Sequence, residues 1–187
     1  MRNIIPITAL LAAVLVALVP ASSNADWEED LDRLLRAEAG PEQEALLARV
    51  LAADPEWTEV ARAIEESAFP EPSERDTALL RTRTCVDSVE RPWVLFVPAS
   101  YEPGRPTPLL LCLHGGVGRA DLIEDPLDHV AESDYRELAS EQGWLAAFPY
   151  GQEGATWWDD VGMENIRGIV RTAKREYNVD DDRVWMI

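Results

Sequence analysis

The residues best suited to chemistry are His114-Gly115-Gly116, which follow a continuous apolar run from Leu109 to Leu113. An apolar run without alternation predicts a strand buried on both faces, and glycines after it let the next loop approach a bound molecule closely. Backbone N–H groups in such a loop can stabilise an oxygen that becomes negatively charged during acyl transfer. The alternative is a glycine turn without a role in catalysis. The secondary structure predicted around the motif is needed to distinguish an oxyanion-binding loop from such a turn.

Strands and helices are predicted to alternate around this motif. Apolar runs predict strands at 109–113, 144–148 and 183–187, and helical periodicity predicts helices at 133–142 and 161–177 between them. Strand–helix repeats of this kind form the parallel sheet of an α/β fold.

An antiparallel pair of strands is predicted before this repeat, at 82–90 and 92–98. Arg91-Pro92 is the expected bend between them. In the second strand Val94 and Phe96 alternate with their neighbours, which predicts that the two sets of side chains lie on opposite faces of a sheet.

Residues 26–70 have a helical pattern, which Gly40-Pro41 and Asp54-Pro55 divide into three short helices. Asp54 is predicted to cap the third helix, with Pro55 at its first position. Asp160 is predicted to cap the start of the helix at 161–177, and Gly143 is predicted to end the helix at 133–142. A segment rich in Pro, Glu and Ser at 69–75 suits a domain boundary. The helical region is interpreted either as a cap that packs on the following domain, or as a small interaction module or a linker to a surface.

The first residues have the pattern of a signal peptide. Arg2 precedes an apolar run at 4–19, and small residues at Ser23 and Ala25 fit a peptidase site, so residues 1–25 would be removed near Ala25. This predicts a secreted or periplasmic protein without stable membrane association after cleavage. An uncleaved membrane anchor is the alternative, although the run is short for a span and contains Pro6.

The charge of the chain argues against some partners. Its 187 residues contain 17 Lys and Arg against 35 Asp and Glu, which gives a net charge of −18. Such a surface repels phosphate backbones and anionic lipids, so no nucleic-acid partner is expected.

The stretch from Arg91 to Ile187 resembles the α/β-hydrolase superfamily, and within it the secreted polyhydroxybutyrate depolymerase and feruloyl esterase branch. The matching segments cover roughly half of the chain; they are PLLLCLHGG (108–116), FPYG (148–151), WWDDV (157–161) and YNVDDDRV (177–184). The resemblance implies an α/β fold in which residues 76–187 form the N-terminal half of an α/β-hydrolase sheet, with strand order 1-2-4-3-5, preceded by the short helical segment.

The resemblance also implies a serine-dependent carboxylic ester hydrolase that acts on a small-molecule or polymeric ester. Gly116 would be the oxyanion donor, with Val117 as the alternative donor. Gly115 would permit the turn, and His114 would brace it through a side-chain hydrogen bond.

Three aromatic residues are predicted to contribute to substrate binding. Tyr150 belongs to a matching segment, and Trp157 and Trp158 lie at the edge of the sheet where α/β proteins bind ligands. The two tryptophans would form an aromatic wall for an aryl or polyester acyl group. The alternative places one of them in the core and leaves the other half exposed.

In this superfamily a G-x-S-x-G elbow follows the strand that ends near Ile187, and the catalytic acid and histidine come later. These 187 residues contain no such pattern. We therefore expect a fragment that is inactive alone and has an exposed last strand. The alternatives are a secreted prolyl-oligopeptidase-like serine peptidase, and a non-catalytic helical binding module on a degenerate hydrolase scaffold.

No cofactor and no metal site is predicted. Asp180-Asp181-Asp182 fits a solvated connection better than a calcium loop. Asp121, Glu124, Asp125 and Asp128 are interpreted as solvated charge near the mouth of the site. With the strand order above, Cys85 on the first strand and Cys112 on the third would be about 14 Å apart, which predicts two free, buried thiols.

Overall fold

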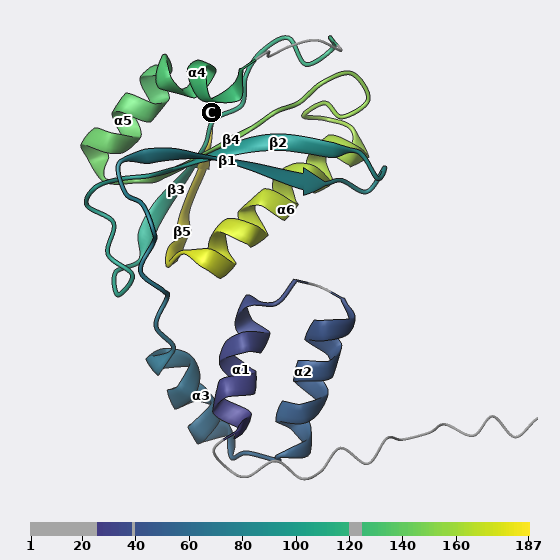
Figure 1. Ribbon diagram of the computed structural model, residues 1–187, viewed down its shortest axis with the longest axis vertical. Helices are drawn as coiled ribbons and strands as arrows, with labels where there is room; N and C mark the ends of the chain where they lie inside the picture. The colour runs from purple at the N-terminus through teal and green to yellow at the C-terminus, as the bar shows by residue number, and fades with distance from the viewer. Residues whose placement is uncertain (1–25, 39, 120–124) are drawn as a thin grey trace, which may run out of the picture.

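A computed structural model of the protein describes residues 26–38, 40–119 and 125–187 (Figure 1). The predicted signal peptide at 1–25 lies outside the described residues, as do Asp121 and Glu124. None of the described helices is long and apolar enough to cross a membrane.

Three short helices precede the sheet, as the apolar spacing predicts: α1 (Asp26–Arg36), α2 (Pro41–Ala52) and α3 (Trp57–Glu66). Their small core is formed by Trp27, Leu31 and Val50. The Arg49 guanidinium joins α2 to α1 by two hydrogen bonds to the Asp30 carboxylate, at 2.7 and 2.8 Å.

The predicted cap at Asp54 is wrong. Asp54 has a φ of 49°, and its N–H donates to the Leu51 carbonyl at 3.2 Å, so it belongs to the turn that ends α2. Glu56 is the N-cap residue of α3 and makes no side-chain capping bond. The chain must first leave α2 through a left-handed residue, which places Asp54 too early to cap the next helix.

The sheet has five strands in the order β1-β2-β4-β3-β5, as predicted. The β1–β2 and β2–β4 pairs are antiparallel, and β3 pairs in parallel with both β4 and β5. The strands are β1 (Thr77–Thr84), β2 (Glu90–Val97), β3 (Thr107–Leu111), β4 (Leu145–Pro149) and β5 (Val179–Met186).

The hairpin between β1 and β2 turns at 85–89, earlier than the predicted bend at Arg91-Pro92. Asp87 fixes this turn: its carboxylate accepts the Val89 N–H at 3.2 Å and two guanidinium bonds from Arg91 at 2.8 and 2.7 Å. The Arg91 side chain is only 4% exposed, so the ion pair is part of the packed hairpin. Pro92 lies within β2, beside Thr82.

Helices cover both faces of the sheet (Figure 1): α6 (Asp160–Glu176) covers one, and α4 (Pro126–Ala131) and α5 (Asp134–Gln142) cover the other. Trp93, Leu95 and Val97 pack with the α6 side. Val94 and Phe96 pack with the other side, which confirms the alternation predicted from the sequence.

Helix boundaries were predicted in part. Gly143 ends α5 in the left-handed conformation, with a φ of 70°, as expected. Asp159, and not Asp160, caps α6 by accepting the Gly162 N–H at 2.7 Å. Helix α4 was not predicted; Asp125 caps it by accepting the N–H groups of Leu127 and Asp128.

The two outer strands differ from the central ones. Trp185, Met186 and Ile187 are exposed, because β5 pairs with β3 alone among the described strands.

Cys85 and Cys112 are buried and free. Cys85 lies in the turn after β1 rather than on the strand, and β2 and β4 separate that strand from β3.

Candidate active site

The loop after β3 leaves the sheet immediately beyond the last parallel pairing. The Leu113 N–H still donates to the Ile187 carbonyl at 2.8 Å. Gly116 then has a φ of 77°, a left-handed conformation that a residue with a side chain adopts only under strain. Within the described residues, the N–H groups of Gly115, Gly116 and Val117 have no hydrogen-bond acceptor. Three successive backbone donors are therefore available at the end of a buried strand.

The His114 side chain links this loop to the loop after β4. The Gly151 N–H donates to His114 Nε2 at 3.0 Å, and His114 Nδ1 lies 2.9 Å from the Gly115 carbonyl oxygen. The Trp157 indole N–H donates to the His114 carbonyl at 2.8 Å. The two loops are thus held together by both the backbone and the ring of one residue.

These contacts assign the tautomer of His114. An amide N–H can only donate, so Nε2 must be the unprotonated acceptor, and Nδ1 carries the proton that it shares with the Gly115 carbonyl. Burial lowers the pKa of His114 below its ordinary value of 6.5; the bond to Gly115 opposes this shift, and the nearby His129 adds to it. The neutral ring is therefore the form that fits this position.

The other predicted site residues divide into buried and exposed groups. Val117 and Tyr150 are buried, and the Tyr150 hydroxyl donates to the Pro126 carbonyl at 2.8 Å. Trp157 packs against the core on the α6 side, and its ring centroid lies 5.1 Å from that of His114. Trp158 is 75% exposed. The two tryptophans thus differ in burial: Trp157 packs against the core, and Trp158 is exposed.

A cavity of about 510 Å³ opens beside the loop after β3. Cys112, Leu113 and Phe148 contribute apolar lining, and His114 and Gly115 contribute the loop itself. The polar part of the lining comes from the end of α4 and the start of α5, namely His129, Glu132, Ser133 and Tyr135. Burial raises the pKa of the Cys112 thiol to about 12, so this cysteine stays protonated and unreactive.

The α4 side of this cavity was not predicted from the sequence. His129 lies in the last turn of α4, with its ring centroid 6.3 Å from that of His114. The Asp125-Pro126 pair could have predicted the helix, because a capping Asp followed by Pro is a common way for helices to begin. Asp125 is therefore a capping residue at this rim as well as a surface charge.

The aspartates at 180–182 are partly engaged with basic side chains. Asp180 accepts from Arg183, and Asp181 forms an ion pair with Lys174 at 2.6 Å. No group of His, Cys, Asp and Glu among the described residues is arranged to hold a metal ion.

Comparisons with known proteins give both esterases and peptidases. No protein-family model matches the chain. A bifunctional acetylxylan esterase/xylanase of Neocallimastix patriciarum is 30% identical over 95 residues, which is 49% of this chain and 13% of that protein. The chain therefore spans about an eighth of the length of this curated relative.

Similar solved structures include a thermostable esterase, with a TM-score of 0.46 and 22% identity over 59% of this chain and 34% of that one. An acetyl xylan esterase from Aspergillus awamori has a TM-score of 0.42 and 16% identity, covering 59% and 41% of the two chains. A ferulic acid esterase from Anaeromyces mucronatus has a TM-score of 0.42 and 17% identity, covering 65% and 52%. At these scores the fold assignment rests on the order and direction of the strands themselves.

Proposed function

We propose that the loop after β3 is the oxyanion-binding part of a serine-dependent carboxylic ester hydrolase, whose nucleophile elbow would follow Ile187. The observation that carries the proposal is the set of three backbone donors at Gly115, Gly116 and Val117, which no acceptor in the described residues satisfies. The identity to an acetylxylan esterase over 95 residues supports the same reaction class.

The proposed chemistry is acyl transfer in two steps. A serine hydroxyl adds to the ester carbonyl, and its proton passes to a histidine base; collapse of the tetrahedral intermediate expels the alcohol and leaves an acyl-serine. Water then releases the acid by the same route. In both steps the carbonyl oxygen becomes negative, and the Gly116 N–H, or that of Val117, would stabilise it.

His114 would position these donors by holding the loop in place. Its ring fixes the loop to Gly151, and its neutral form holds the Gly115 carbonyl, so that this carbonyl does not turn toward the oxyanion. The cavity next to Gly115 would receive part of the ester, with Trp157 supporting the loop from behind. We also propose that the apolar leader directs the protein out of the cytoplasm.

The test uses the product of the complete reading frame with p-nitrophenyl acetate as substrate. Replacing Gly116 by Ala should lower kcat/KM by about a hundredfold: a side chain strains the left-handed backbone at this position and should displace the N–H, and loss of one oxyanion donor typically has that effect. Gly118→Ala is the matched control: a methyl group there meets nothing within 4 Å, so activity should be unchanged. Thermal unfolding would show that both variants remain folded.

Two results would refute the proposal. One is a coding sequence beyond Ile187 that lacks G-x-S-x-G, together with no labelling by an alkyl fluorophosphonate. The other is hydrolysis of peptides but not of esters by the complete protein, which would favour the peptidase alternative.

A further inference from the structure

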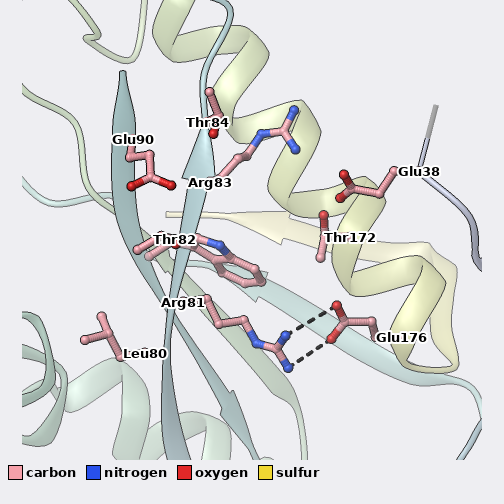
Figure 2. Close-up of a pocket in the computed structure, with 10 residues that line it drawn as sticks. Glu38, Leu80, Arg81, Thr82, Arg83, Thr84, Glu90, Thr172 and Glu176 are labelled. Atoms are coloured by element: carbon pink, nitrogen blue, oxygen red, sulfur yellow. Dashed lines mark hydrogen bonds and ion pairs between the residues drawn. The ribbon is translucent and has the colours of Figure 1, made fainter. Parts of the chain in front are cut away.

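A second cavity, of about 580 Å³, lies between β1, α6 and the residues after α1, and shares no lining residue with the cavity beside the loop after β3 (Figure 2). Successive residues of β1 from Leu80 to Thr84 line it, and side chains of successive strand residues point to opposite faces. The free edge of β1 therefore forms one wall. Thr172 and Glu176 of α6 form the other wall, and Glu38 closes one end.

Three arginines project from the β1–β2 hairpin toward the α6 side: Arg81, Arg83 and Arg91. Two of them have carboxylate partners, because Arg81 pairs with Glu176 at 2.9 Å and Arg91 pairs with Asp87 at 2.7 Å. Arg83 has no carboxylate partner within the described residues. A cation that is half buried and lacks a partner is unusual in a chain with twice as many acidic as basic residues.

The Arg83 guanidinium is held in place by packing. It lies against Gly168 of α6, where even one added methyl group would overlap it. Its Nε is buried and has no hydrogen-bond acceptor. Glu164 is close enough for Arg83 to contribute to lowering its pKa, but its carboxylate bonds to Arg171 instead.

The acidic residues around the cavity do not neutralise Arg83. Glu38 pairs with Arg175 at 2.9 Å, and Arg175 also donates to the Thr172 hydroxyl at 3.0 Å. Glu90 lies opposite Thr84 in the hairpin and so faces the other side of the sheet from Arg83. Figure 2 shows Arg83 turned toward α6 and Glu90 on the far side of β1. Of the three hairpin arginines, Arg83 alone has no carboxylate ion-pair partner among the described residues.

We propose that this cavity binds a small hydroxylated carboxylate, such as an acidic sugar. The carboxylate would accept bonds from the Arg83 guanidinium, which suits planar, two-pronged recognition. Hydroxyl groups of the ligand would donate to the carboxylates of Glu38 and Glu176, which keep acceptor capacity beyond their ion pairs. The proposal does not depend on ester hydrolysis, because none of these residues belongs to the loop after β3.

Calorimetric titration of the full-length protein with D-glucuronate tests this site, with D-glucose as the uncharged counterpart. Glucuronate should bind at least tenfold more tightly than glucose. Arg83→Gln should weaken glucuronate binding about tenfold or more, because a charge-assisted hydrogen bond is lost. Arg105→Gln removes the same charge from an exposed loop and should leave binding unchanged.

Gly168→Ala provides a second test that retains the charge. The added methyl group should displace the guanidinium and weaken glucuronate binding, while the unfolding temperature reports whether the chain remains folded. Equal affinity for glucose, or unchanged affinity in Arg83→Gln, would overturn the proposal. Acetate binding as tight as glucuronate binding would overturn the role given to the ligand hydroxyls.

Discussion

The helices before the sheet and the sheet itself use apolar residues in different ways. In the sheet, every residue of β3 and β4 is buried, and helices cover both faces. In the helical unit, α1–α3, the buried core is small, while Leu47, Leu51 and Trp57 are exposed. Ion pairs such as Arg49–Asp30 supplement that core. Because a small core contributes little stabilisation, the helical unit should be the weaker part of the molecule.

The largest effect is expected in the centre of the sheet. Leu109 of β3 is fully buried, so Leu109→Ala should lower the free energy of unfolding by about 3–4 kcal/mol through lost burial and a cavity. Urea unfolding followed by far-UV circular dichroism would measure it. Leu51→Ala is the control on the helical unit: Leu51 is 63% exposed, and the change should stay within about 0.5 kcal/mol. Equal losses in the two variants would contradict the contrast.

A smaller effect is expected inside the helical unit. Leu46 is 1% exposed, and Leu46→Ala should cost about 2 kcal/mol, at the low end for such changes, because a small unit can relax around the gap. The loss should be confined to the helices. Hydrogen exchange should accelerate in α1–α3 while the protection of β3 and β4 is retained. Uniform loss of protection would mean that the two parts unfold as one.

The two parts should also respond differently to acid. The pKa of His114 is lowered by burial, so the unfolded chain binds more protons than the folded chain, and stability at this loop is lost as pH falls below about 6.5. The pKa values of Asp30 and Asp32 are lowered by their arginine partners, so the helical unit keeps their contribution until pH falls below 3.8. The protection factor of the Gly151 amide, which corrects for the intrinsic pH dependence of exchange, should therefore fall as pH drops below about 6.5, before those of α1 and α2 respond.

Two variants of His114 distinguish the effect of its protonation from the effect of its hydrogen bond to Gly151. His114→Gln keeps an acceptor near the Gly151 N–H and should remove the pH dependence. His114→Phe removes the acceptor and should cost about 1 kcal/mol at every pH. If the His114→Gln variant keeps the pH dependence of the parent protein, another group is responsible for it.

The smallest effect is expected where the two parts meet. Arg175 of α6 pairs with Glu38, whose side chain is 75% exposed. An exposed ion pair is typically weak, so Glu38→Gln should change stability by no more than about 0.5 kcal/mol. Differential scanning calorimetry would measure it, with Glu42→Gln as a control in an ion pair within the helical unit. A loss of several kcal/mol would show that the helices are a tightly packed cap.

Hydrophobic periodicity predicted most of the architecture. Unbroken runs gave β3 and β4, because strands buried on both faces need apolar side chains at every position. Alternation in β2 gave the correct two faces. The order 1-2-4-3-5 came from the resemblance to a known fold, since periodicity contains no information on which strands are neighbours.

Short sequence motifs gave wrong predictions of helix starts and turns where the backbone conformation around them, and not the motif, determines the structure. The Asp-Pro pair occurs at 54–55 and again at 125–126, with opposite outcomes. Asp125 is extended and caps α4, whereas Asp54 is left-handed and completes the end of α2. The hairpin turn was misplaced for a similar reason: Pro92 suggested a bend, but the Asp87–Arg91 ion pair fixes the turn before it.

The sequence predicted where the candidate site lies, but not the hydrogen bonds that hold it together. The glycine motif located the loop after β3, but nothing in the spacing indicated that the His114 ring would accept the N–H of Gly151, in the loop after the neighbouring strand β4. The paired tryptophans looked equivalent in sequence. Only packing distinguishes Trp157, which is fixed to the His114 carbonyl, from the exposed Trp158.

The outer strand β5 has one consequence that can be followed optically. Trp185 on this strand lies against Trp144, with ring centroids 4.8 Å apart and ring planes at 53°. Two indoles this close couple electronically and produce paired bands of opposite sign in ultraviolet circular dichroism. Any polypeptide that adds to the free side of β5 would alter the angle between the rings, so these bands offer a label-free reporter of what covers the strand.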